Sequence, residues 1–262
     1  MTRLLSFVVV VVLGMLGMPA FAALDDLPSG GAARVTTVID GDTVVLDDGR
    51  QVRLVGIQAP KLALGRVDFQ PWPLGEEAKA YLETLVDGKT VELRLGAQPM
   101  DRHGRVLAHL RGADDGAWLQ GALLAAGLAR VYTFADNRQL AREMLALERQ
   151  ARADRLGLWG LPYYALRDPD NARHDVDTFQ VVEGRVLDVA RIKDRVYLNF
   201  GADWRSDFTI KIWTRAQKTF DKSGVDLMAL KGKRVRVRGW IKSENGPMIE
   251  LDHPERLEIL AP

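Results

Sequence analysis

The sequence predicts a mixed α and β protein (α+β), mainly β, that is built from two consecutive domains. Its 262 residues are enough for two domains of ordinary size, each with its own core. Short segments in both halves alternate apolar and polar residues between turn-forming residues, as half-buried strands do. A few longer segments have helical spacing instead. We place the domains at residues 34–162 and 179–262, with residues 163–178, rich in Asp, Arg and Pro, as a linker.

The first domain is expected to open with three strands, and Asp47-Asp-Gly49 supplies the hairpin turn between the second and the third. A helix follows at Glu76–Val86, because its apolar residues share one face and two glutamates stand at its positive N-terminal end. Two more strands and two closing helices complete the domain. The expected strands are Arg34–Ile39, Thr43–Leu46, Gln51–Ile57, Lys89–Leu95 and Arg105–Leu110, and the closing helices are Trp118–Ala126 and Arg138–Leu156.

The second domain is expected to contain five strands and one helix in the order of an OB-fold barrel, a fold that commonly binds oligonucleotides or oligosaccharides. A turn at Glu244-Asn-Gly246 joins the last two strands. The expected strands are Gln180–Val189, Arg195–Phe200, Asp207–Trp213, Arg234–Lys242 and Met248–Leu251, with the helix at Ala216–Leu230. In the fourth strand Arg234, Arg236 and Arg238 alternate with valines, which indicates a charged, solvated face. A patch that binds nucleic acid is the alternative interpretation.

The first 22 residues have the pattern of a Sec-type signal peptide. Arg3 precedes an apolar stretch, Leu4–Met18, that is shorter than the roughly twenty residues a spanning helix needs, and Ala20-Phe-Ala22 offers a cleavage site. We therefore expect a periplasmic or secreted protein with no transmembrane segment after cleavage; an uncleaved N-terminal anchor is the alternative. Residues 23–33, rich in Gly and Ala, are expected to form a flexible lead-in. The chain has no cysteine, so it forms no disulfide.

The charge balance argues against binding to nucleic acid through overall charge. The chain has 36 basic and 35 acidic residues, and removal of residues 1–22 takes away one basic residue. Non-specific nucleic-acid binders gain most of their affinity from an excess of positive charge, because they neutralise phosphates. Any polyanion must therefore bind to a local patch.

Three segments of the first domain carry a more specific pattern. They are Asp40-Gly-Asp-Thr43, Arg53-Leu-Val-Gly-Ile-Gln-Ala-Pro-Lys61 and Asp101-Arg-His-Gly-Arg105. In order and spacing they resemble the active-site segments of the staphylococcal nuclease (thermonuclease) family, and the resemblance covers about residues 34–160. It implies a five-stranded OB-fold barrel with helices. The family's central segment reads Arg-Leu-x-x-x-Asp-x-Pro-Glu. In the family this Asp is a metal ligand and this Glu is the catalytic carboxylate. Here Gln58 stands at the Asp position and Lys61 at the Glu position.

The resemblance implies roles for several residues. Asp42 would bind calcium through its side chain and Ala59 through its backbone carbonyl. Arg53 and Arg105 would be the catalytic arginines that hold the phosphate, since a planar guanidinium suits two phosphate oxygens. Asp40 and Thr43 are expected to support their turn by hydrogen bonds to the backbone. The remaining candidate ligand-binding residues are Gln58, Lys61, Tyr132 and Phe134, the last two at the place where the family has two tyrosines lining its nucleotide pocket.

These departures weaken the case for calcium, because calcium affinity rises with the number of charged ligands. We expect Lys61 to take over the electrostatic role of the ion, which would leave a metal-free cationic site and no cofactor. The sequence thus predicts an exported nuclease-like protein that binds phosphate-bearing, nucleic-acid-like or other anionic ligands, with calcium-dependent phosphodiester hydrolysis lost or reduced. Two alternatives stay open. One is an active phosphodiesterase with another catalytic base, which would use Ca2+. The other is a non-enzymatic envelope module that binds protein or glycan.

Overall fold

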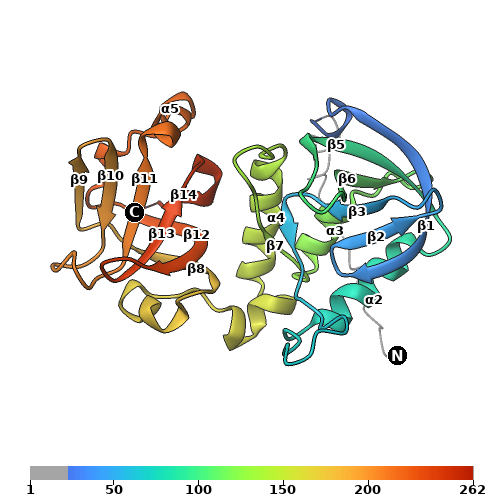
Figure 1. The fold of residues 1–262 in the computed structure, drawn as a ribbon, viewed down its shortest axis with the longest axis horizontal. Helices are drawn as coiled ribbons and strands as arrows, with labels where there is room; N and C mark the ends of the chain where they lie inside the picture. The colour runs from blue at the N-terminus through green and yellow to red at the C-terminus, as the bar shows by residue number, and fades with distance from the viewer. Residues whose placement is uncertain (1–22, 262) are drawn as a thin grey trace, which may run out of the picture.

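The computed structural model describes residues 23–261, and Figure 1 shows two β-domains side by side with α4 (Ala141–Ala153) and β7 (Arg130–Val131) between them. The predicted signal peptide at residues 1–22 lies outside the described residues. Within residues 23–261, no helix is long and apolar enough to cross a membrane.

The first domain is a closed barrel of five strands in the order β1-β2-β3-β6-β5, as predicted. Neighbouring strands are antiparallel except for β3 and β6, which run parallel. Apolar residues of the strands and of the helices α2, α3 and α4 form its core. The strands are β1 (Ser29–Asp40), β2 (Thr43–Leu46), β3 (Gln51–Leu54), β5 (Thr90–Met100) and β6 (Val106–Gly112), and the first two helices are α2 (Gly75–Val86) and α3 (Leu119–Ala125).

Two expectations for the first domain are corrected. The flexible lead-in is wrong for Ser29–Ala33, because these residues belong to β1 and close the barrel by pairing with β5; Leu24 before them is buried in the core. The expected strand Gln51–Ile57 is two strands, β3 and β4 (Ile57–Gln58). Gly56 separates them with a φ of 83°, which favours glycine, and β4 then pairs with β7 outside the barrel.

The second domain repeats this connectivity. Its strands are hydrogen-bonded in the order β9-β10-β11-β13-β12-β8, with β11 and β13 parallel. The two strands at the ends of this order, β8 and β9, are consecutive in the chain. The sheet therefore has the connectivity of a small OB-like barrel, although within the described residues no pairing between β8 and β9 closes it. Its elements are β8 (Phe179–Arg185), β9 (Asp188–Ile192), β10 (Arg195–Asn199), β11 (Thr209–Trp213), α5 (Thr214–Lys222), β12 (Arg234–Ser243), β13 (Pro247–Leu251) and an added β14 (Leu257–Ile259) on the edge of β12.

Buried polar contacts join the two domains. Arg238 on β12 forms ion pairs of 2.8 Å with Glu148 of α4 and with Glu258 of β14, and its side chain is 1% exposed. His253 Nε2 lies 2.8 Å from the Thr133 hydroxyl of the first domain. The expected solvated face of β12 is therefore wrong at Arg238, because the first domain covers it. Buried charges keep such positions only when they are paired, so this interface holds the domains in one arrangement.

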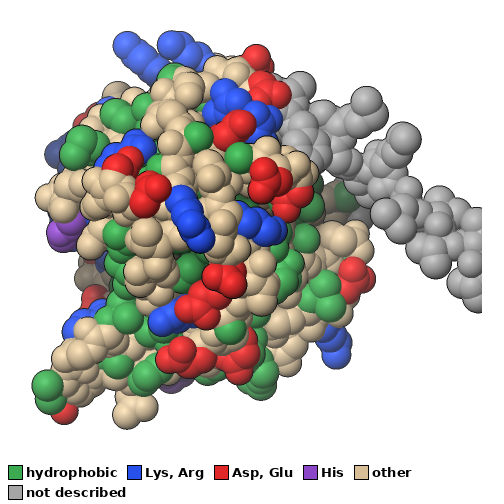
Figure 2. All heavy atoms as spheres, turned by 90° about the vertical axis from the view of Figure 1, so that its right-hand side faces the viewer, with side chains coloured by type: hydrophobic (Ala, Val, Ile, Leu, Met, Phe, Trp, Pro, Cys, Tyr) green, Lys and Arg blue, Asp and Glu red, His purple; other side chains and the backbone are tan. Residues whose placement is uncertain are grey.

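The surface has no region dominated by one charge on the face that Figure 2 shows. Basic and acidic side chains are interspersed over this face of the first domain. This agrees with the near-zero net charge of the chain.

Candidate functional site

The candidate site is built on the turn between β1 and β2. Asp42 lies in this turn and is fully buried. Gly41 allows the turn to pass between two other segments, since a Cβ there would lie 2.7 Å from the Cβ atoms of Ala59 and Ala78. Asp40 supports the turn as predicted, accepting a hydrogen bond of 3.1 Å from the Asp42 N–H. The Thr43 hydroxyl contacts the Asp42 carboxylate rather than the backbone, at 3.3 Å.

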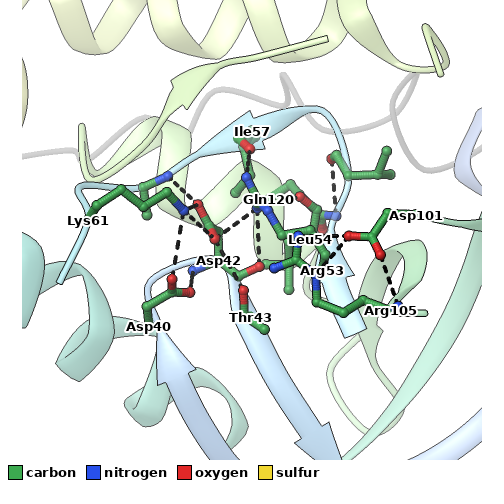
Figure 3. Close-up of polar contacts among 12 residues, drawn as sticks. Asp40, Asp42, Thr43, Arg53, Leu54, Ile57, Lys61, Asp101, Arg105 and Gln120 are labelled. Atoms are coloured by element: carbon green, nitrogen blue, oxygen red, sulfur yellow. Dashed lines mark hydrogen bonds and ion pairs between the residues drawn. The ribbon is translucent and has the colours of Figure 1, made fainter. Parts of the chain in front are cut away.

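Lys61 points directly at the Asp42 carboxylate (Figure 3). Its ammonium donates to Oδ1 at 3.0 Å and to Oδ2 at 2.9 Å, and lies 3.7 Å from Asp40 Oδ2. The backbone N–H of Ala59 donates to Asp42 Oδ2 at 2.7 Å. Burial alone would raise the pKa of Asp42, but Arg53, Lys61 and these hydrogen bonds outweigh it and hold the pKa below its ordinary value. The carboxylate is therefore a stable anion with a fixed cation beside it.

Arg53 on β3 completes this cluster from the other side. Its Nη1 forms an ion pair of 2.9 Å with Asp42 Oδ1 and donates to the carbonyls of Asp42 and Leu54, while Nη2 donates to the Ile57 carbonyl at 2.8 Å. The side chain is 12% exposed. Arg53 thus ties the β3–β4 turn to the Asp42 turn, and the protein itself already occupies both of its terminal nitrogens.

Arg105 lies beside Arg53 because the parallel register of β3 and β6 places it next to the start of β3. Its Nε donates to Asp101 Oδ2 at 2.8 Å, and Nη2 forms an ion pair with the same oxygen at 2.7 Å (Figure 3). Asp101 also accepts from the backbone N–H groups of His103 and Arg105, which fixes the turn. The Arg105 side chain is 30% exposed. Of the two predicted phosphate-binding arginines, it is the more accessible.

Gln58 does not face Asp42. Its Oε1 accepts two hydrogen bonds from Arg130, from Nε at 3.0 Å and from Nη2 at 2.8 Å, and its side chain is buried. The Arg130 guanidinium lies 4.6 Å from the ring centre of Phe179 in the second domain and 5.5 Å from that of Trp72. Burial lowers the pKa of Arg130 to about 10, so it stays charged at neutral pH. The residue at the second metal-ligand position therefore points to the domain interface.

The donor set does not fit calcium. Calcium prefers six to eight oxygen ligands, several of them charged. Here the Asp42 oxygens are taken by an ammonium, a guanidinium and a backbone N–H, and Gln58 is turned away. Ala59 presents its N–H to Asp42, whereas the resemblance implied a role for its carbonyl. Among residues 23–261 no three His, Cys, Asp or Glu residues gather as a metal would require.

The expected cationic charge of the site is corrected. Counting only Asp42 against Lys61, Arg53 and Arg105 gave an excess of positive charge, but Asp40 and Asp101 also lie within ion-pair distance of these cations. The six groups balance when all are ionised. Burial and the neighbouring Asp42 raise the pKa of Asp40, so its charge is the first to be lost on acidification.

Tyr132 and Phe134 lie where the first domain meets the second. The Tyr132 hydroxyl accepts a hydrogen bond of 3.0 Å from Trp240 Nε1, and its ring packs 4.7 Å from that of Phe179. Phe134 contacts Tyr132 edge to face and is 53% exposed. Within residues 23–261, no hydrogen bond or ring contact links either side chain to Lys61 or Arg105. Their neighbours in the second domain were not expected.

Arg130 was missed by sequence reasoning. It follows Gly127-Leu-Ala129 and stands two residues before Tyr132, and only the β4–β7 pairing of the structure places it opposite Gln58. Two-residue strands leave no alternating pattern from which this pairing could be predicted.

Comparisons with known proteins agree with the fold of the first domain. Residues 51–160 match the family model described as "Staphylococcal nuclease homologue". The chain is 29% identical to the thermonuclease of Staphylococcus intermedius over 133 residues, which cover 50% of this chain and 77% of that protein. It is 31% identical to "Protein ParB" of Escherichia coli over 162 residues, 54% of this chain and 81% of that protein. An uncharacterized protein of Methanocaldococcus jannaschii is 29% identical over 147 residues, 48% of this chain and 70% of that protein.

Proposed function

The chain belongs to the family of staphylococcal nuclease homologues, and from this premise we propose that it binds nucleic acid or another phosphate-bearing ligand without a metal ion. In this proposal the calcium-dependent phosphodiester hydrolysis of the family is lost or strongly reduced. We propose further that the protein is exported, on the sequence of residues 1–22 alone; N-terminal sequencing of the protein from fractionated cells, with cleavage expected after Ala22, tests this.

One observation carries the proposal: the Lys61 ammonium bridges both carboxylate oxygens of Asp42. A primary ammonium so placed neutralises the carboxylate and satisfies its hydrogen-bonding capacity. A divalent ion would have to displace it, and Arg53 would then face the ion at close range. The same lysine stands where the family has its catalytic carboxylate, so one side chain both occupies the Asp42 oxygens and replaces the base.

Phosphate recognition remains with Arg105. Its guanidinium is partly exposed and is held in orientation by Asp101 on one side only. A guanidinium has five N–H donors, so Arg105 can bind Asp101 and a phosphate oxygen together. The three positive and three negative groups of the cluster cancel, so the site has no net positive charge to attract a phosphate. The affinity should come from the hydrogen bonds of Arg105 and should be modest.

Thermal unfolding with a nucleoside 3′,5′-bisphosphate, measured in EDTA, tests the binding. A ligand that binds the native state raises the melting temperature, and we expect Arg105→Ala to abolish the rise. Arg102→Ala is the matched control, because Arg102 is an exposed arginine of the same turn without a role in the cluster. An equal shift in Arg105→Ala would place the anion site elsewhere.

Hydrolysis of single-stranded DNA with calcium and with EDTA tests the loss of activity. We expect no calcium-dependent cleavage by the wild-type protein above that of an Asp42→Asn, Arg105→Ala variant. Calcium-dependent cleavage by the wild type would favour the alternative of an altered but working nuclease.

A further inference from the structure

Three aromatic side chains form a continuous row across the domain junction. Phe134 and Tyr132 come from the first domain, with ring centres 5.1 Å apart, and Trp240 on β12 of the second domain donates its Nε1–H to the Tyr132 hydroxyl at 3.0 Å. The outer rings are well exposed, Phe134 at 53% and Trp240 at 44%. Single exposed apolar residues are common on protein surfaces, whereas contiguous ones mark interaction sites.

The row is rigid although its rings belong to two domains. Tyr132 packs on Phe179 of β8, and the next residue, Thr133, is hydrogen-bonded to the buried His253. The Arg238–Glu148 ion pair joins β12, which carries Trp240, to α4 of the first domain. Ring positions that are fixed before binding lower the entropic cost of binding.

The row is also connected to the candidate site. The Tyr132 N–H donates to the Gly56 carbonyl at 2.8 Å, and the next carbonyl along that chain, of Ile57, accepts from Arg53. Tyr132 is thus anchored to the same β3–β4 turn that holds Arg53. At the other end of the row, Trp240 lies on β12 of the second domain.

We propose that this row is a stacking platform for single-stranded nucleic acid and that Trp240 is the contribution of the second domain to binding. The inference rests on the proposed function of the first domain and extends it. Exposed rings stack on any base, and the two exposed outer rings, Phe134 and Trp240, can each accept one base of the same strand. Paired bases are stacked within a duplex and cannot lie on these rings.

Fluorescence anisotropy with oligodeoxythymidylates of increasing length tests the platform, beside a nucleoside 3′,5′-bisphosphate as the shortest ligand. We expect Trp240→Ala to weaken binding of the longer strands about 5- to 100-fold, the range for loss of one base–ring contact. Affinity for the bisphosphate should not change. Trp240→Phe keeps a ring and should retain most of the affinity. Trp204→Ala is the matched control, since Trp204 is 52% exposed in the β10–β11 loop, outside the row.

Photo-crosslinking of the wild-type protein to a strand with photoreactive bases gives a second readout that needs no variant, with Trp240 or Phe134 as the expected crosslinked residue. Unchanged strand affinity in Trp240→Ala, with bisphosphate binding intact, overturns this inference alone. Binding of a duplex as tight as that of the single strand, with the same dependence on Trp240, also overturns it. If the wild type binds neither strands nor bisphosphate, the proposed function and this inference fail together.

Discussion

The ammonium of Lys61 lies 2.9 to 3.0 Å from both carboxylate oxygens of Asp42, and the backbone N–H of Ala59 donates to one of the same oxygens. Asp42, which the family resemblance assigns to calcium binding, is therefore part of an internal ion pair in this protein. Arg53 shares the same carboxylate, so the first domain holds two cations around one buried anion without help from a metal. The stability of the protein should therefore depend on the Asp42 charge and not on a bound metal ion.

Asp42→Asn should destabilise the protein strongly, because Lys61 and Arg53 then lose the carboxylate between them. Breaking a buried ion pair from one side costs on the order of 3 kcal/mol. EDTA should leave the melting temperature of both wild type and variant unchanged, since Lys61 and not a metal is the partner. Urea unfolding in EDTA and in calcium measures both effects. Asp48→Asn is the control at an exposed Asp–Arg pair and should change stability far less. A large drop of wild-type stability in EDTA would contradict the metal-free site.

Arg238→Met should lower the free energy of unfolding by about 3 kcal/mol, because Glu148 stays buried and keeps only Arg152 of its two cationic partners. The matched control is Arg234→Met, which lies four residues earlier on the same face of the same strand. Arg234 pairs with Glu183 but its side chain is 55% exposed, so its loss should cost below about 1 kcal/mol. Calorimetry should also show one unfolding transition for the wild type and two for Arg238→Met. Equal effects of both substitutions would mean that the interface contributes little.

Acidification should lower the free energy of unfolding, and His109 should account for part of this decrease. This histidine is 1% exposed in the barrel core, and burial lowers its pKa to about 3. The unfolded chain takes up the proton near pH 6.5. Between about pH 6.5 and pH 3 the unfolded state therefore binds one more proton than the folded state, and stability decreases as pH decreases, by up to about 1.4 kcal/mol per pH unit.

His109→Gln should remove this part of the pH dependence, which urea unfolding at several pH values measures. His103→Gln is the control, because His103 is exposed in the folded protein. A variant His109→Gln with the full wild-type slope would assign the acid sensitivity to other groups, such as the buried carboxylates.

Local pattern predicted the strands, the Asp47-Asp-Gly49 turn and the helices of the first domain. The resemblance of the three motif segments to the staphylococcal nuclease family then implied the barrel and placed Asp42, Lys61 and Arg105 in one site. It did not predict what each side chain contacts. Arg53 turns its nitrogens to carbonyls of its own turn, which only the β3–β4 geometry decides. Likewise, the alternation along β12 predicts an exposed side chain for Arg238. The side chain is buried only because the other domain covers it.

Gln58 provides the sharpest example, because its side chain points away from the site. Its Oε1 is held by Nε and Nη2 of Arg130, whose guanidinium is stacked on Phe179. An aspartate at position 58 is one methylene shorter than Gln58, but its carboxylate would still lie beside the buried Arg130 guanidinium. An ion pair between the two is stronger than the present contact of the guanidinium with a neutral amide. Restoring the family's charges at positions 58 and 61 alone should therefore not restore a metal site.

The last prediction follows from this geometry. The double variant Gln58→Asp, Lys61→Glu should show little calcium-dependent cleavage of single-stranded DNA, whereas adding Arg130→Met should release the new carboxylate toward Asp42 and produce clear cleavage. Methionine keeps an apolar side chain of similar length against Phe179. Groups that act as a unit are strongly non-additive, so the gain should appear only in the triple variant. Calcium binding by calorimetry separates the two steps, with Arg130→Met alone as the control for folding. Cleavage by the double variant equal to that of the triple would show that Arg130 does not capture the carboxylate. A triple variant that binds calcium yet stays inert would show that the positioning of the water, and not the loss of the metal site, limits the chemistry, since a misplacement of about 1 Å can cost on the order of a hundredfold in rate.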